Sequence, residues 1–231
     1  MMVSAFDRIV IAVPHLAEAG DLYRQLLGIE PAGIERDGTA RAWFALPNTV
    51  IELVQSPGKH PLIQGVVFAS AGGKDVDRSI GNSRGLDIRQ CSPDPGSACR
   101  VQLEDPGPGC LRVDHLVLRT ADAAGCIDLF GRRLGIRLAL DKTVPEWGGR
   151  MLFFRVGKLT LEIIESQGEP VAADHFWGLA YQCENLEQTA RQLAGRGVSL
   201  SGIRPGRKPG SLVATVNSHC LGIPTLLLQP G

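Results

Sequence analysis

Two stretches of sequence decide the fold of this chain: residues 6–29 are FDRIVIAVPHLAEAGDLYRQLLGI, and residues 113–136 are VDHLVLRTADAAGCIDLFGRRLGI. They align without a gap at an offset of 107, and eight of their 24 positions are identical. Ordinary composition gives roughly one or two such matches by chance. The identical pairs are Asp7/Asp114, Val10/Val117, Ala17/Ala124, Asp21/Asp128, Leu22/Leu129, Leu27/Leu134, Gly28/Gly135 and Ile29/Ile136. A repeat of this length predicts a duplicated domain, in which function is confined to the places where the copies differ.

Length and composition are those of an ordinary globular protein. The chain has 231 residues, of which 44% are hydrophobic, so it can hold two domains with cores of their own. Its formal net charge is +0, which gives no broad electrostatic attraction to nucleic acid or to anionic membranes. The six cysteines are scattered without a CxxC pair, and neither a secretory signal nor a long apolar run is present. These features predict a reduced, cytoplasmic protein with no nucleic-acid or membrane partner.

Each copy of the repeat begins a unit with the order β-α-β-β-β. A short apolar strand is followed by a segment with apolar residues at helical spacing, which ends at Gly28 or Gly135, where a left-handed C-cap favours glycine. Two further strands follow, joined by turns short enough for hairpins. The predicted strands are residues 6–13, 41–46 and 49–55 in the first unit and 113–120, 151–156 and 158–165 in the third.

A second pair of units fills the remaining sequence. The fourth unit is complete, with a helix over residues 186–194 and a closing hairpin of residues 211–216 and 223–229. In the second unit, residues 65–70 begin a strand, but the chain runs from residues 100–103 almost at once into the third unit, so its closing strand is short, missing or fused to the next strand. This truncation leaves a sheet edge that a homodimer could cover. The sequence leaves open which units pair with each other.

Four β-α-β-β-β units, with Leu-Gly-Ile ending the first-helix motif, resemble the vicinal-oxygen-chelate superfamily of glyoxalases, bleomycin resistance proteins and extradiol dioxygenases. The resemblance implies an α+β fold in which the four units form two cupped mixed β-sheets with flanking helices. It places an N-terminal domain over residues 1–107 and a C-terminal domain over residues 108–231. The fold alone does not select a function, because it serves isomerases, epimerases, dioxygenases and non-catalytic binding proteins.

The same resemblance implies one divalent metal ion, held by an inward-facing residue early in the first strand and another in the last strand of each unit. The third unit offers His115 and Glu162 there. The first unit offers Arg8 and Glu52, and arginine cannot bind a cation because it keeps its proton and has no free lone pair. The other two units offer no clear ligand: Val66 and Gln102 in the second, Gly178 and about Leu226 in the fourth.

His115 and Glu162 are therefore the candidate catalytic and metal-binding residues. Two protein ligands are fewer than the three usual in a catalytic metal site, although Gln102 or another side chain could join them. Without a metal, the pair is expected to hydrogen-bond within a pocket, as buried polar groups must, and to act as base and orienting partner. Arg8 and Glu52 are expected to form a salt bridge in place of a lost site.

Five aromatic or histidine side chains are candidate ligand-binding residues. Trp43 and Phe153 lie on matching hairpin strands, where adjacent residues face opposite sides of the sheet. The others, Trp147, His175 and Trp177, lie at the expected rim of the C-terminal cup. Each has a simpler interpretation, as core filling for the aromatic residues and as a surface residue for His175.

Two functions fit these residues. The first is an enzyme that acts on a small oxygenated organic molecule in the C-terminal cup, as a metal-assisted lyase or isomerase. Ring cleavage is less favoured, because the extradiol enzymes that the chain resembles need a second histidine where it has Gly178. The alternative is a metal-free protein that binds or sequesters an apolar or aromatic small molecule.

Overall fold

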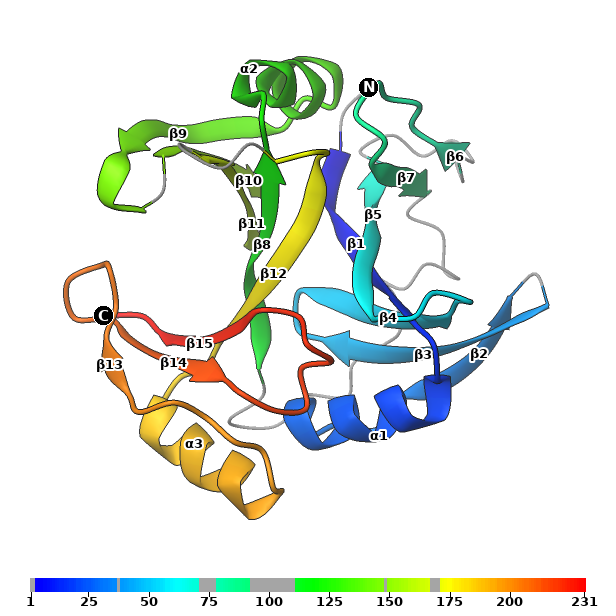
Figure 1. Ribbon diagram of the computed structural model, residues 1–231, viewed down its shortest axis with the longest axis vertical. Helices are drawn as coiled ribbons and strands as arrows, with labels where there is room; N and C mark the ends of the chain where they lie inside the picture. The colour runs from blue at the N-terminus through cyan, green and yellow to red at the C-terminus, as the bar shows by residue number, and fades with distance from the viewer. Residues whose placement is uncertain (1–2, 37, 71–77, 92–110, 148, 167–170) are drawn as a thin grey trace.

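The computed structural model describes residues 3–36, 38–70, 78–91, 111–147, 149–166 and 171–231, which form two mixed β-sheets with helices beside them (Figure 1). The N-terminal sheet consists, in spatial order, of β2 (Ala32–Arg36), β3 (Thr39–Leu46), β4 (Thr49–Gln55), β1 (Val3–Val13), β5 (Leu62–Ser70), β7 (Asp87–Cys91) and β6 (Arg78–Ser79). The C-terminal sheet consists of β13 (Arg204–Pro205), β14 (Leu212–Val216), β15 (Thr225–Gln229), β12 (His175–Gln182), β8 (Arg112–Thr120), β11 (Leu159–Ser166), β10 (Gly149–Val156) and β9 (Arg137–Val144). The predicted α+β class is confirmed.

Strand pairing settles how the four units combine. In each half the first strand of one unit lies antiparallel to the first strand of the next: β1 pairs with β5, and β8 pairs with β12. Each first strand also pairs in parallel with the last strand of its own unit, as β1 does with β4 and β8 with β11. The first unit therefore combines with the second and the third with the fourth, within this one chain.

The second unit has a closing strand, and it lies earlier in the chain than the sequence suggested. β7 pairs in parallel with β5, as the closing strands of the other units pair with their first strands. The strand predicted at residues 100–103, together with Gln102, lies outside the described residues. The expectation of a missing or fused closing strand is corrected, because the backbone reaches the closing position at residues 87–91, directly after a turn that Gly85 makes with φ of 71°.

In the described part of the chain three α-helices lie beside the sheets, and their ends follow local signals. α1 (Leu16–Leu27) ends at Gly28, whose φ of 72° is the left-handed conformation predicted for that glycine. α3 (Leu186–Gly195) begins after Asn185, whose side chain accepts a hydrogen bond from the backbone N–H of Gln188. α2 (Ala123–Cys126) continues as a wider π-helical segment, η2 (Ile127–Arg133), and a short turn, η3 (Pro145–Trp147), precedes β10. Among the described residues, none of these helices has the length and apolar character of a membrane span.

The two sheets share one hydrophobic core. Phe6 and Phe68 of the N-terminal sheet, with ring centroids 4.7 Å apart, belong to the same buried cluster as Leu116 and Phe154 of the C-terminal sheet. Asn48 fixes the register between the halves, because its side chain donates to the carbonyl of Val113 at 2.6 Å and accepts from its N–H at 3.1 Å. The sheet faces that look away from this core are the two cups.

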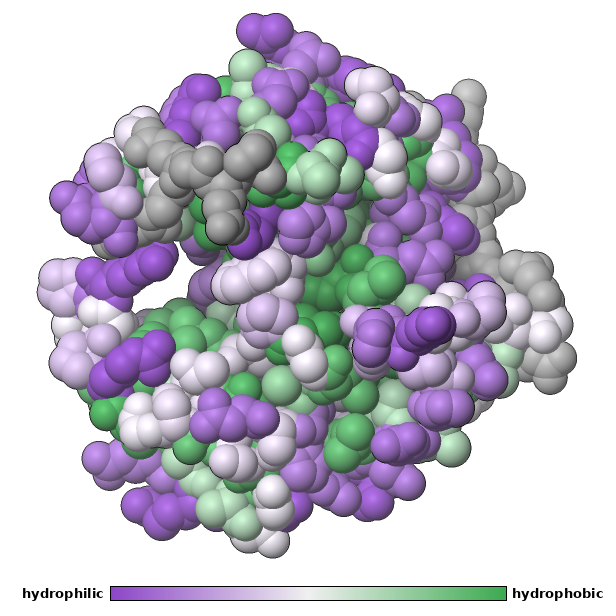
Figure 2. Space-filling view, in the orientation of Figure 1, coloured by the Kyte–Doolittle hydropathy of each residue, from purple (hydrophilic) through white to green (hydrophobic). Residues whose placement is uncertain are grey.

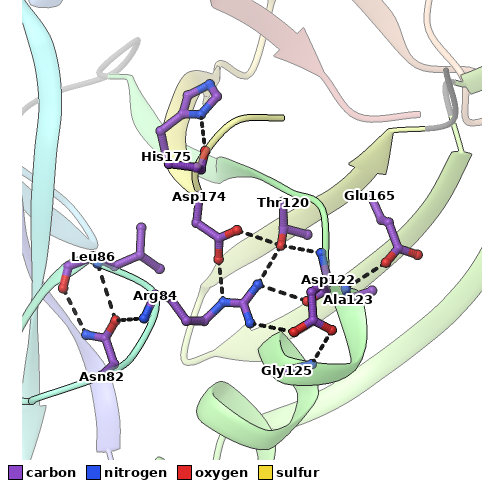
Figure 3. A network of polar contacts seen from close by, with 11 residues as sticks. Asn82, Arg84, Leu86, Thr120, Asp122, Ala123, Gly125, Glu165, Asp174 and His175 are labelled. Atoms are coloured by element: carbon purple, nitrogen blue, oxygen red, sulfur yellow. Dashed lines mark hydrogen bonds and ion pairs between the residues drawn. The ribbon is translucent and has the colours of Figure 1, made fainter. Parts of the chain in front are cut away.

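A partly buried ionic cluster also joins the halves (Figure 3). Arg84, between β6 and β7, donates to Asp122 at 2.9 Å, to the Thr120 hydroxyl at 2.7 Å and to Asp174. The Thr120 hydroxyl also donates to Asp174 at 2.8 Å. Burial lowers the pKa of Arg84, but its hydrogen bonds to Asp174 and Asp122 outweigh this and raise the pKa overall. These four residues, which we call the Arg84 cluster, form a contact between the halves that the repeat did not predict.

Candidate functional site in the C-terminal cup

Residues that alternate along the strands occupy the two cups. On β1, Ile9 and Ile11 enter the shared core, whereas Val10 and Ala12 form a separate small cluster on the opposite face. The predicted split between adjacent aromatic residues follows the same rule. Phe44 and Phe154 belong to the shared core, while Trp43 and Phe153 face the cups.

The N-terminal cup is closed by a neutralised ionic cluster. Arg8 donates from Nε to Glu52 Oε2 at 2.6 Å and from Nη1 to Asp7 Oδ2 at 2.5 Å, and Arg41 binds the other oxygen of Glu52. The guanidinium of Arg8 lies 5.4 Å from the ring centre of Trp43. Burial lowers the pKa of Arg8, but Asp7 and Glu52 outweigh it and raise the pKa. The predicted Arg8–Glu52 ion pair is present. The positively charged Arg8 therefore occupies the first-strand position at which the resemblance implies a metal ligand.

The C-terminal cup holds the same framework with different chemistry. His115 Nδ1 lies 2.8 Å from Asp114 Oδ2, and His115 Nε2 lies 3.6 Å from Glu162 Oε2. Burial raises the pKa of Asp114, but the hydrogen bond and charge of His115, with Lys208 and Arg155 nearby, outweigh it and lower the pKa. Asp114 is therefore ionised at neutral pH and accepts a hydrogen bond from Nδ1. The structure brings the two predicted residues, His115 and Glu162, together.

An incomplete contact marks the centre of this cup. When Nδ1 of neutral His115 carries the proton, Nε2 presents a lone pair toward the carboxylate of Glu162. Two acceptors 3.6 Å apart do not bond to each other. Glu162 is only 7% exposed, and among the described residues its one ionic neighbour is His115. A buried carboxylate needs a partner, so this pair favours a ligand that brings a proton donor between Nε2 and Oε2.

The donor set around His115 and Glu162 is too small for a resident metal ion. Asp114 already binds the other nitrogen of His115, an arrangement also found behind metal-bound histidines. The fourth unit adds no ligand, because a Cβ atom on Gly178 would lie 2.6 Å from the carbonyl oxygen of Pro224 and the closing-strand position is Leu226. Within the described ranges, no three His, Cys, Asp or Glu side chains are grouped to hold a metal. A catalytic metal site usually has three protein ligands, and His115 and Glu162 supply two, so this donor set does not fit such an ion.

The strand register corrects the first-strand position that was predicted for the second unit. Gly65 and Gly178 hold equivalent places, since they pair with Val10 and Val117 of the two first strands. A Cβ atom on Gly65 would likewise lie against a closing-strand backbone, 2.2 Å from the carbonyl oxygen of Asp87. The second unit therefore presents glycine, rather than the expected Val66, at this place. In both units the backbone of the first strand lies so close to that of the closing strand that only glycine fits. The second and fourth units therefore present no side chain at this position.

The remaining predicted ligand-binding residues are distributed unevenly. Phe153 lies directly across from Glu162 on β10 and is half-buried. Trp177 is 40% exposed, and its ring centre lies 5.8 Å from the guanidinium carbon of Arg119. His175 is exposed at the edge of β12, with Nδ1 3.1 Å from the carbonyl of Ala173 (Figure 3). Trp43 belongs to the other cup, and the side chain of Trp147, at the end of η3, lies outside what the structure describes.

Three polar residues of this cup were missed from the sequence. Asp114 is identical to Asp7 in the repeat and directly precedes His115, and this identity was the signal that could have found it. Arg119 and Arg155 gave no such signal. Arg119 donates to the Ser166 hydroxyl at 2.8 Å, and Arg155 donates to the Thr160 hydroxyl at 2.6 Å.

Apolar surface accompanies these polar groups. Leu140 of the edge strand β9 pairs with Phe153 and is 48% exposed. Figure 2 shows a notch at the left edge of the molecule, below β9 and beside the turn that joins β13 to β14, with hydrophobic residues next to it. An apolar hollow with a few convergent polar groups is the usual form of a small-molecule site.

Comparison with known proteins agrees with this architecture. Residues 114–215 match the model of the "Glyoxalase/Bleomycin resistance protein/Dioxygenase superfamily". The match lies in the C-terminal half of the chain. A search of curated protein sequences gives no match.

Solved structures resemble this chain over nearly its whole length. A mutant of 4-hydroxymandelate synthase from Streptomyces coelicolor has a TM-score of 0.73 at 13% identity, covering 99% of this chain and 93% of that one. The 2,3-dioxygenase LapB from Pseudomonas sp. KL28 has a TM-score of 0.71 at 12% identity, covering 100% and 94%. The Mn(II)-bound glyoxalase from Novosphingobium aromaticivorans has a TM-score of 0.68 at 15% identity, covering 99% and 82%. At these identities the likeness shows a shared fold.

Proposed function

We propose that this protein is an enzyme that transfers protons on a small oxygenated organic molecule bound in the C-terminal cup, as an isomerase or lyase. The observation that carries the proposal is the row Asp114–His115–Glu162, in which one side of the imidazole is held and the other faces a carboxylate across a 3.6 Å gap. A hydroxyl or enol of the substrate fits that gap, because it supplies the donor that the two acceptors lack.

His115 serves as the general base in this proposal. Asp114 accepts from Nδ1–H, which fixes the ring and leaves Nε2 free to take a proton from carbon next to a carbonyl group. The imidazolium that forms is stabilised between Asp114 and Glu162. Returning the proton to the same or a neighbouring atom completes an isomerisation, and expulsion of a leaving group from the next carbon completes a lyase reaction.

The experiment follows exchange of carbon-bound hydrogen in D₂O by NMR, with a panel of small aldehydes, ketones and 2-oxo acids. We expect protein-dependent exchange for at least one compound, and a loss of about 10²- to 10⁴-fold with His115→Gln. The matched control is His60→Gln, which changes an exposed histidine of the other half. Exchange that persists in His115→Gln, or that no panel member shows, contradicts the proposal.

A second candidate is a protein that binds and sequesters an apolar or aromatic molecule, and the exposed side chains of Leu140 and Trp177 favour it. Tight binding of panel compounds without exchange supports this function. Metal analysis of protein purified without chelators separates a third outcome, in which a divalent ion joins His115 and Glu162. Stoichiometric metal that is lost in His115→Gln supports that outcome and replaces the metal-free mechanism.

A further inference from the structure

We infer that the ligand of the C-terminal cup is an elongated carboxylic acid, and that Arg119 binds its carboxylate while Trp177 contacts its apolar body. The inference rests on the proposed site but not on its chemistry, since it concerns binding alone. It begins from a cation that has no counter-ion among the residues that the structure describes. Among the described residues, the hydrogen bond that Arg119 makes goes to the neutral hydroxyl of Ser166, and its other contact is the ring of Trp177.

Two well-buried arginines elsewhere in the described residues are neutralised by carboxylates. Arg8 in the N-terminal cup binds two carboxylates, and Arg84 between the halves binds Asp122 and Asp174. Arg119 is half-buried on the cup face of β8, yet it binds no carboxylate of the described chain. Withdrawing a guanidinium from water without an anion is unfavourable, so the site is arranged for an anion that arrives with the ligand.

A local irregularity of β12 builds the site. The register of β12 against β8 shifts between Phe176 and Gly178, so Trp177 is the extra residue of a β-bulge. Bulges redirect a side chain, and here the redirected indole lies over the guanidinium of Arg119. The face of Trp177 that remains exposed can contact the apolar body of a ligand while Arg119 and Ser166 bind its acid group.

The position of Arg119 defines the shape of the ligand. It lies four residues beyond His115 on the same face of β8, roughly 13 Å along the strand at the usual rise. Arg119 reaches away from His115, because its partner Ser166 is the last residue of β11. The carboxylate of the ligand therefore lies at the opposite end from the part that faces His115, with an apolar body between them.

Calorimetric titration with 4-phenylbutyrate and its neutral counterpart 4-phenylbutanol tests this arrangement. We expect Arg119→Gln to weaken binding of the acid about 10-fold or more and to leave binding of the alcohol unchanged, because a charge-assisted hydrogen bond is lost. Trp177→Leu should weaken both ligands alike. Arg132→Gln, on the exposed side of η2, is the matched control and should change neither.

Arg155 provides the competing location, since it is another cup-facing arginine whose hydrogen bond goes to a hydroxyl. A larger loss with Arg155→Gln than with Arg119→Gln overturns the inference, as does equal affinity of the wild-type protein for acid and alcohol. His115→Gln separates the two proposals. Loss of proton exchange with retained acid binding supports both, whereas selective acid binding in a protein that exchanges no hydrogen supports this inference and contradicts the proposed chemistry.

Discussion

Glu52 and Glu162 occupy the same place in the two halves of the molecule and differ in what surrounds them. Each pairs with the valine of its first strand, Val10 or Val117, and each faces its cup. Glu52 binds two guanidiniums, whereas the one ionic partner of Glu162 in the described part of the chain is His115, at 3.6 Å. Two differences between the copies account for the contrast: arginine for histidine at the first-strand position, and Arg41 where the second copy has Met151.

This contrast teaches how a duplicated fold can separate stability from chemistry. In the N-terminal cup the buried charges satisfy one another, so the cluster resists solvent and ligands alike. In the C-terminal cup the polar groups are left short of partners, which costs stability and creates a site. Substitutions in one cup should therefore act on unfolding, and those in the other on binding and catalysis.

The largest effect is expected from Glu52→Gln. Removing this carboxylate charge leaves the buried Arg8 and the nearby Arg41 with too little negative charge, which should lower the free energy of unfolding by about 3 to 5 kcal/mol. Urea denaturation measures the change, and proton exchange by the folded variant should stay normal. A loss under about 1 kcal/mol breaks the comparison between the cups.

Arg84→Ala should come next, because it removes the shared partner of Asp122 and Asp174 between the two halves. We expect a loss of roughly 3 kcal/mol in urea denaturation. The control is Arg89→Ala, which breaks an ion pair with Asp87 on a half-exposed side chain and should cost about 1 kcal/mol or less. Equal effects of the two variants contradict the role given to the Arg84 cluster.

Glu162→Gln should act on the site rather than on folding. Its amide keeps the shape but cannot stabilise the imidazolium of His115, so we expect hydrogen exchange to slow about 10- to 100-fold, or about 1.4 to 2.7 kcal/mol of barrier. Urea denaturation should change by less than about 1 kcal/mol. If Glu162→Gln unfolds the protein as Glu52→Gln does, the two cups do not differ as described.

The smallest effect is a pH dependence at Asp114. Its pKa lies below the ordinary value in the folded protein, because the His115 contact and nearby cations outweigh burial. The carboxylate therefore stabilises the fold fully above its unfolded pKa of about 3.9, and this contribution disappears as the pH falls through the folded pKa. The stability difference between wild type and Asp114→Asn should shrink as the pH falls below about 4. A difference that does not vary with pH contradicts this assignment.

Much of the fold could be predicted from the repeat and from short-range signals. The strand predicted at 49–55 matches β4, and the helix that ends before Gly28 matches α1. These elements depend on alternation and on a glycine with positive φ, which are local properties. The π-helical segment η2 and the closing strand β7 were not predicted, because packing and strand pairing across the sheet determine them.

The site was predicted only in part. His115 and Glu162 could be located because the resemblance to the vicinal-oxygen-chelate superfamily implies ligands at those two strand positions, and the structure places their side chains together. Arg119 and Trp177 could not be linked, since a bulge in β12 decides where the indole lies. The sequence also could not show that the glycine Gly178 is pressed against the backbone of the closing strand.

The sequence by itself determined the duplication, the α+β class and the exchange of histidine for arginine between the copies, because identity and alternation along a strand need no knowledge of distant neighbours. Only the tertiary structure decided which units pair, how Asp114 holds His115, and that Arg119 has no carboxylate partner within the described ranges. Those facts depend on distances between segments far apart in the chain, and such distances arise only when the two sheets fold around their shared core.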